Sequence, residues 1–228
     1  MNIIEMLKTY NAVDLTHLME LDMPVWPTHP RYFQNEVESW DKNEDSYLNQ
    51  LSFGEHTGTH VDAPVHFIKG GKSIADIDAL HLISHAVKID MSYTPPTQSI
   101  GIEQIKLWEE KHQPIKENDI VIFYTGYQHR WAKRPNDKEF LRDWPGLSRD
   151  VAQYLANKKI KAVGTDAMTV DAYIHDNYPA HDIFLNKEIL IIENLNNIDK
   201  LPDNFIFIAL PLKIANGSAS PIRAVALY

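Results

Sequence analysis

The sequence contains no cysteine among its 228 residues. This absence excludes disulfide bridges, thiolate nucleophiles and zinc sites built from cysteine. Basic side chains are also few, since 22 lysines and arginines stand against 31 aspartates and glutamates and give a formal net charge of -9. Nothing in the chain resembles a basic stripe for phosphates, so the composition argues against a nucleic-acid partner.

Long hydrophobic runs are missing as well. The longest apolar stretches, such as FIFIAL and ILII, have the size of strands and fall short of the roughly 20 residues that a membrane helix needs. Residues 1–13 include an acidic side chain, Glu5, and lack the charged, apolar and small-residue order of a secretion signal. We therefore expect a cytoplasmic protein without a membrane partner.

Short runs of β-branched and apolar residues recur along the chain and are typical of buried strands. Helical patterns separate them, and Ser148 and Pro179 stand where two helices would begin. The predicted strands span residues 85–91, 119–126, 160–166, 188–195 and 204–214, and the predicted helices span residues 102–113, 148–160 and 179–187. This alternation predicts an α/β protein with a partly parallel sheet.

The first 70 residues differ, because four prolines separate short extended pieces there. We expect an antiparallel sheet in this region. The chain has no repeat, no low-complexity segment and no linker rich in glycine, proline or serine. Its length and its 44% apolar content therefore predict a single globular domain over residues 1–228.

The densest group of polar residues lies in residues 54–67, GEHTGTHVDAPVHF. Gly58 and Pro64 argue against a helix in this segment. As an extended strand with a period of two, it would turn its apolar residues toward the core. The opposite face would carry the polar side chains, namely His56, His60, Asp62 and His66. Two imidazoles and a carboxylate from His56, His60 and Asp62 predict a divalent-metal site with coordination positions left open.

The segment HTGTHVDAPVHF resembles the H-x-G-T-H-x-D-x-P-x-H signature of the metal-dependent cyclase-like hydrolases, which include enzymes of the kynurenine formamidase and isatin hydrolase type. Residues 14–30, 145–171, 179–201 and 209–227 also resemble family segments in the family order. The resemblance therefore covers nearly the whole chain. It implies a layered β/β/α swivelling-domain fold with mixed parallel and antiparallel sheets.

The resemblance implies which residues bind metal. His56, His60 and Asp62 match the ligands of a first ion, and Asp62 matches a bridge to a second one. His181 and Glu193 match the histidine and the shared glutamate of the second site. Glu193 also ends a run of four apolar residues, where an unpaired carboxylate is costly unless a cation meets it. The expected cofactor is zinc or manganese, with one or two ions.

The resemblance also implies the chemistry. His66 matches a proton-transfer histidine, and Trp26 matches an aromatic wall to which Phe33 and Trp40 would add. Ser220 is a candidate for a hydrogen bond to substrate or, before a proline, for shaping a turn. The implied reaction is hydrolysis of a small amide by metal-activated water. The amide would be an N-formyl aromatic amine, such as N-formylkynurenine, or a cyclic amide, such as isatin.

Several alternatives stay open at this point. The same site would suit a lyase or cyclase that acts on a hydroxy acid or polyketide-like compound. A non-catalytic protein could also close five ligands around a structural ion. Asp166 and Asp171 could hold the second nitrogen of a histidine ligand or could form turns and helix caps. His17 could line the pocket or make a structural hydrogen bond.

The segment from residue 24 to residue 40 predicts self-association. It brings Trp26, Tyr32, Phe33 and Trp40 together in a region that we expect to have little regular structure to bury them. Exposed aromatic surface of this kind is typical of an interface, and identical subunits are the commonest partners. The resemblance also favours a homodimer or a homotetramer.

Overall fold

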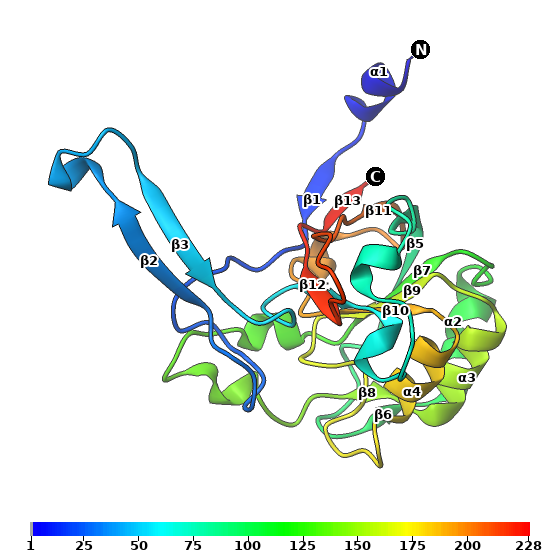
Figure 1. Cartoon of the computed structure of the whole chain (residues 1–228). Helices are drawn as coiled ribbons and strands as arrows, with labels where there is room; N and C mark the ends of the chain where they lie inside the picture. Colours follow the sequence, from blue (N-terminus) through cyan, green and yellow to red (C-terminus); the bar gives the residue numbers. More distant parts are fainter. Residues whose placement is uncertain (1) are drawn as a thin grey trace.

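In the computed structural model, which describes residues 2–228, nine strands form one mixed sheet at the centre of the protein (Figure 1). Met1 lies outside the described residues. The strand order in the sheet is β1-β13-β11-β5-β7-β9-β10-β4-β12. The helices are α1 (Ile3–Leu7), α2 (Ile102–Lys111), α3 (Arg149–Asn157) and α4 (Pro179–Asn186). The strands are β1 (Ala12–Asp14), β2 (Phe33–Glu38), β3 (Leu48–Ser52), β4 (His60–Asp62), β5 (Ile83–Asp90), β6 (Ser99–Ile100), β7 (Ile120–Tyr124), β8 (Gly146–Leu147), β9 (Ala162–Thr165), β10 (Leu190–Glu193), β11 (Asn204–Ile208), β12 (Ala219–Pro221) and β13 (Val225–Leu227).

The sheet is parallel in its middle and antiparallel toward both edges. Strands β5, β7, β9 and β10 pair in parallel, whereas β4, β11, β12, β13 and β1 pair antiparallel with their neighbours. All five predicted strands and all three predicted helices are present, with shorter ends except for β5, which begins two residues earlier than predicted. The last of the predicted strands, β11, stops at Ile208 rather than at residue 214. It ends before Pro211, because proline cannot donate a hydrogen bond to a sheet ladder.

Apolar residues of the central strands alternate between two cores. Val121 and Phe123 belong to a cluster with residues of helices α2, α3 and α4, whereas Ile120 and Ile122 belong to a cluster on the other face. The second cluster includes both Phe207 of β11 and Ile192 of β10. These strands are well separated in the sheet order, so this core extends along most of one face of the curled sheet. The mixed α/β fold with parallel and antiparallel pairing is therefore confirmed.

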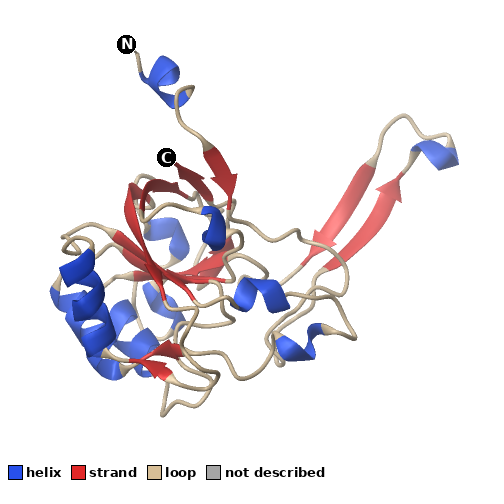
Figure 2. Cartoon of the chain, turned by 180° about the vertical axis from the view of Figure 1, so that it is seen from behind, coloured by secondary structure: helices blue, strands red, loops and turns tan. Residues whose placement is uncertain are grey.

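The N-terminal region is organised differently from the prediction. The expected antiparallel sheet is present only as the two-stranded pair β2–β3, because β1 pairs with β13 and β4 lies between β10 and β12 in the large sheet. Strands β2 and β3 form a separate antiparallel hairpin that projects away from the body of the protein (Figures 1 and 2). The expectation of little regular structure therefore holds for residues 24–32 and is wrong for residues 33–38, which form β2.

The four aromatic residues of that segment do not lie together. Tyr32 is buried and stacks on Phe53 with ring centroids 6.3 Å apart, while Trp26 packs against a small cluster that contains Trp144. Trp40 is 64% exposed in a 3-10 helix between the two hairpin strands. The pairing of β2 with β3 carries Trp40 away from Trp26 and from the body.

Both ends of the described chain belong to one sheet, since β1 pairs with β13. This pairing supports the proposal that the chain is a single domain. No helix within residues 2–228 combines the length and the apolar composition that crossing a bilayer requires.

Candidate active site

The polar segment 54–67 is not a continuous strand. Only His60–Asp62 is extended within the sheet, because Gly58 takes a left-handed φ of 62° and Pro64 begins a 3-10 helix. The predicted alternation therefore holds only near β4. Val61 is fully buried in the core as expected, but Phe67 is 39% exposed and lines a cavity. The kink at Gly58 and the turn at Pro64 fold the polar residues around one point.

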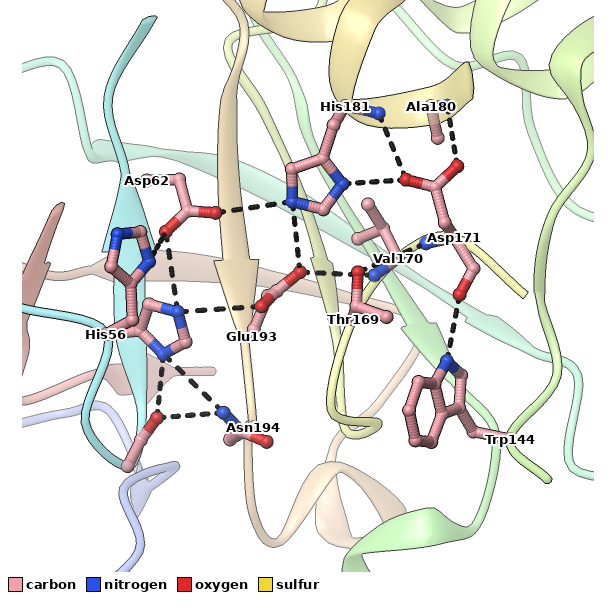
Figure 3. A network of polar contacts seen from close by, with 12 residues as sticks. His56, Asp62, Trp144, Thr169, Val170, Asp171, Ala180, His181, Glu193 and Asn194 are labelled. Atoms are coloured by element: carbon pink, nitrogen blue, oxygen red, sulfur yellow. Dashed lines mark hydrogen bonds and ion pairs between the residues drawn. The ribbon is translucent and has the colours of Figure 1, made fainter. Parts of the chain in front are cut away.

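The structure brings the five predicted ligands together from three elements. Strand β10 pairs with β4 so that Glu193 lies opposite His60, and His181 projects from the first turn of α4. The Nε2 atom of His60 lies 3.4 Å from Oδ1 of Asp62 and 3.5 Å from Oε2 of Glu193. The Nε2 atom of His181 lies 3.4 Å from Oδ2 of Asp62 and 3.5 Å from Oε1 of Glu193 (Figure 3). His56 reaches the same carboxylate, with its Nδ1 atom 2.8 Å from Oδ1 of Asp62.

These donor atoms fit a divalent cation. The Nε2 atom of His60 and both carboxylate oxygens of Asp62 are buried and lack a hydrogen bond of regular geometry within the described residues, although they lie in ion-pair contact with one another and with His56 and His181. Burying such atoms is costly, and a metal ion would satisfy all of them. Two sets of ligand atoms, each within 4.8 Å of one another, share Asp62. One set adds His60 and Glu193, and the other adds His56 and His66. Imidazole and carboxylate ligands suit zinc and manganese alike.

The electrostatics of the cluster favour positive charge. Burial alone would raise the pKa of Asp62, but the neighbouring His56 and His181 hold it well below its usual range. Burial and the charge of Asp62 raise the pKa of Glu193. Burial alone would lower the pKa of His181, but its contacts with Asp171 and Asp62 raise it to about 10. The buried carboxylates of Asp62 and Asp171 thus raise the pKa of the His181 imidazole. A bound cation would balance the same negative charge.

Each predicted histidine ligand has a partner for its other ring nitrogen. The Nδ1 atom of His60 lies 2.8 Å from the carbonyl oxygen of Gly58, and the Nε2 atom of His56 lies 3.0 Å from Oγ of Ser218. The Nδ1 atom of His181 lies 2.7 Å from Oδ2 of Asp171 (Figure 3). Such partners fix the orientation of a ligand ring and its tautomer.

Asp171 combines the two roles that the sequence left open. Its carboxylate holds the ring of His181 and also accepts the backbone N–H groups of Ala180 and His181, at 2.7 and 3.2 Å, in the first turn of α4. Asp166 has a different role, because it accepts the N–H and hydroxyl of Thr125 and the N–H of Gln128. It therefore fixes the turn after β7.

Replacing Asp171 with asparagine should lower metal affinity by about 10- to 100-fold, because an amide cannot accept from all three donors and His181 loses its orientation. Chelator competition measures this affinity. Asp166→Asn is the matched control, since it removes an equally buried carboxylate with three donors but touches no predicted ligand. It should lower the melting temperature and leave metal affinity within about twofold. Equal losses of affinity in both variants would contradict the positioning role of Asp171.

A cavity of about 200 Å³ opens beside the ligand cluster. Its walls are formed by Trp26, His29, His56, His60, His66, Phe67, Met168, Thr169, Tyr178, His181 and Glu193. The ring of His66 lies 4.1 Å from that of His56, measured between centroids. Burial lowers the pKa of His66 to about 4, with Asp62 opposing the decrease and His56 adding to it. The His66 ring is thus neutral at pH 7, so one of its ring nitrogens has a free lone pair.

The other predicted substrate contacts differ from the structure. Phe33 and Trp40 belong to the hairpin region and do not line the cavity, so their predicted part in the aromatic wall is wrong. Ser220 is fully buried in β12, outside the cavity wall. Its hydroxyl accepts the N–H of Leu212 and donates to the carbonyl of Pro221, both at 2.8 Å. These bonds shape the backbone near a proline, which was the alternative for this residue.

Five lining residues were not predicted from the sequence, namely His29, Phe67, Met168, Thr169 and Tyr178. Phe67 was assigned to the core, because an unbroken alternation would place it beside Val61. Tyr178 directly precedes the helix-starting Pro179, and His29 follows Trp26 in the WPTHP segment. Their positions next to predicted residues were the available signal.

His17 lies outside the cavity wall and has a structural environment. It is 5% exposed, its backbone N–H donates to Oγ1 of Thr59, and its ring stacks on Trp131 with centroids 3.9 Å apart. Burial lowers the pKa of His17 to about 4. The Nε2 atom has no hydrogen-bond partner among the described residues. The protonated form of this ring is therefore disfavoured in the folded protein.

This histidine should make the protein acid-sensitive. Unfolded His17 binds a proton below about pH 6.5 and folded His17 only below about pH 4, so stability falls as pH decreases through this window. The loss should approach about 3 kcal/mol, and His17→Phe should lack that part of it. Urea unfolding at pH 7 and pH 4 measures the difference. His112→Phe, at a surface histidine stacked on Trp108, should retain the wild-type pH dependence. Identical profiles for wild type and His17→Phe would contradict the interpretation.

The curled sheet and the imidazole and carboxylate donor set are those of a metal-dependent enzyme of mixed α/β type. The family model described as "Putative cyclase" matches residues 13–172. An isatin hydrolase from Roseibium aggregatum is 32% identical over 244 residues, which cover 95% of this chain and 91% of that protein. A kynurenine formamidase from Bacillus thuringiensis is 32% identical over 222 residues, which cover 96% of this chain and 98% of that protein.

A solved structure supports the same family. The crystal structure of an isatin hydrolase bound to the product analogue thioisatinate superposes with a TM-score of 0.92 and 28% sequence identity, covering 100% of this chain and 99% of that one. The chain therefore belongs to the cyclase-like hydrolase family, as the HTGTHVDAPVHF segment indicated.

Proposed function

We propose that this protein is a metal-dependent hydrolase of carbon–nitrogen bonds other than peptide bonds, with a small aromatic amide as its substrate. One observation carries the proposal, namely that the buried donor cluster opens directly onto a cavity walled by the aromatic side chains of Trp26, Phe67 and Tyr178. The similarity to isatin hydrolase and kynurenine formamidase supports it.

The proposed metal ligands are His56, His60, Asp62, His181 and Glu193, which would hold one or two zinc or manganese ions. Such an ion, when bound, polarises an amide carbonyl and lowers the pKa of a coordinated water. A site closed around a structural ion is less well supported, because the cavity leaves one side of the cluster open. The lyase alternative is not favoured, because the relatives are amide hydrolases.

His66 would act as the acid and base of the reaction. A ring nitrogen of neutral His66 takes a proton from the attacking water and returns it to the leaving nitrogen as the carbon–nitrogen bond breaks. The products are a carboxylic acid, which ionises, and an amine. The rings of Phe67 and His181, with centroids 4.7 Å apart, place an apolar surface beside the ligands and limit the access of bulk water.

The cavity favours an uncharged substrate. None of the described residues that line it is a lysine or an arginine. The carboxylate of N-formylkynurenine would find no lysine or arginine partner in the cavity wall, which is costly in an aromatic pocket. A neutral cyclic amide such as isatin, or a simple N-formyl aniline, has no such group. We therefore propose the neutral aromatic amides as the substrate class.

Metal-loaded protein incubated with isatin, formanilide, N-formylkynurenine and a simple aryl ester tests this proposal. We expect turnover of the neutral amides and slower turnover of N-formylkynurenine, with metal-depleted protein as the control. Fully metallated, folded protein that hydrolyses no amide would refute the proposed function. Faster turnover of N-formylkynurenine than of isatin would refute the choice of substrate class.

We also propose that the protein is a homodimer held by the β2–β3 hairpin, or a homotetramer built from such dimers. A lone two-stranded hairpin is marginally stable in water. This one and its connecting turn expose six large apolar or aromatic side chains, namely Phe33, Val37, Trp40, Tyr47, Leu48 and Leu51. A second copy of the chain would cover them. A cytoplasmic location also stays a prediction.

Light scattering at micromolar concentration should give at least twice the chain mass of 26.2 kDa. A double variant, Trp40→Glu with Leu51→Glu, should shift the protein toward the monomer. Leu80→Glu is the control, since this leucine is 67% exposed but lies outside the hairpin. A wild-type mass near that of one chain would exclude the assembly.

A further inference from the structure

Tyr178 joins two aromatic walls of the cavity that come from distant parts of the chain. Its ring centroid lies 6.5 Å from that of Trp26, at an interplanar angle of 60°, and 5.7 Å from that of Phe67, at 70°. The three residues belong to an N-terminal loop, the turn after β4 and the residue before α4. Together they bound an apolar space with flat surfaces on several sides.

The backbone of Tyr178 is strained in a way that aims this ring. Asn177 and Tyr178 both have left-handed conformations, with φ values of 57° and 47°. A bulky side chain rarely adopts this conformation, because its Cβ approaches the following carbonyl oxygen. The surrounding structure holds it, since the N–H of Tyr178 donates to Nδ1 of His175 at 3.2 Å and its carbonyl accepts the N–H of Asp182 at 3.1 Å. Strain that a fold maintains at a ligand pocket points to a role in binding.

The aromatic wall and the metal ligands share one anchor. Trp26 packs against Trp144, with ring centroids 6.1 Å apart, and the Nε1–H of Trp144 donates to the backbone oxygen of Asp171 at 2.9 Å (Figure 3). The carboxylate of the same Asp171 orients His181. A flat ring packed against Trp26 and Tyr178 would therefore have a fixed position relative to the ligand cluster.

Resting on the proposed amide hydrolysis, we propose that Tyr178 is a specificity-determining residue that selects amides fused to a flat aromatic ring. The ring of Tyr178 is tilted by 60° or more from its two aromatic neighbours, so each neighbour offers a different surface to a substrate ring. Aromatic rings prefer offset-stacked and edge-to-face contacts, which this arrangement provides. An aliphatic amide of the same size gains little from it.

Phthalimide and succinimide test this inference, because they share the five-membered imide and differ by one fused benzene ring. Tyr178→Leu should lower kcat/KM for phthalimide by about 3- to 10-fold, mainly through KM, because the variant loses an aromatic contact. Succinimide turnover should stay within about twofold. Tyr178→Phe should keep the preference. Tyr93→Leu, at a tyrosine 65% exposed outside the cavity wall, is the matched control.

Calorimetric binding of the two imides to metal-depleted protein separates this inference from the proposed function. Wild-type protein that hydrolyses neither imide would count against the proposed function, while tighter binding of phthalimide that is lost in Tyr178→Leu would still support the role of Tyr178. An equal effect of Tyr178→Leu on both imides, or no effect on either, would overturn the inference.

Discussion

Replacing Asp62 with asparagine is expected to remove most of the bound divalent metal and nearly all of the hydrolytic activity. Asp62 is shared by both sets of candidate ligand atoms, and its two oxygens face His60 and His181 separately. Asparagine keeps the shape but replaces an anionic oxygen with an amide nitrogen, which is no metal ligand when it carries its protons. Metal affinity should fall by more than about 100-fold. This loss exceeds the one expected for Asp171→Asn, which removes only the partner of a ligand's second ring nitrogen.

Elemental analysis of the dialysed protein and chelator competition measure this effect, and circular dichroism checks the fold. Asp41→Asn changes an exposed aspartate and should keep the full metal content. Glu193→Gln tests the second carboxylate in the same way, because Glu193 contacts His60 and His181 from the neighbouring strand β10. Stoichiometric metal in Asp62→Asn would show that the ion binds elsewhere.

Replacing His66 with asparagine should lower turnover by about 100-fold or more while the metal content stays unchanged. The His66 ring lies at the cavity wall, and burial keeps it neutral near pH 7, so one ring nitrogen has a free lone pair. Asparagine is similar in polarity but has no basic nitrogen. The loss should therefore appear in kcat rather than in KM.

The metal content of this variant decides between two roles, since a ring nitrogen of His66 also lies within 4.8 Å of ligand atoms of His56 and Asp62. Loss of metal in His66→Asn would place His66 among the ligands. Full activity would remove it from the mechanism. His112→Asn, at a surface histidine remote from the cavity wall, should change neither quantity.

Local sequence patterns predicted the elements of the fold because they depend on neighbouring residues. The apolar runs that became β7, β9 and β10 are buried on both faces, and Ser148 and Pro179 begin helices α3 and α4 as expected. Three proposed ligands lie within seven residues, so their grouping is also nearly local. His181 and Glu193 were assigned through resemblance to a family, since no local pattern connects them with residues 56–62.

Tertiary structure decided the features that depend on which distant segments meet. Asp166 and Asp171 lie in the same short sequence, yet one fixes a turn and the other holds His181, because α4 begins beside only one of them. Phe67 lies at the cavity rather than in the predicted core position, because Gly58 and Pro64 break the strand.

By itself, the sequence determined the α/β composition and the grouping of His56, His60 and Asp62 in one stretch, because burial and backbone preferences act over a few residues. The walls of the cavity and the projecting hairpin were decided only by the folded chain. The order of strands in the curled sheet and the paths of its loops bring Trp26, Phe67 and Tyr178 together and keep Trp40 apart from them. Contacts between residues so far apart in the chain follow from how the whole sheet is assembled, and no pattern of neighbouring residues encodes that assembly.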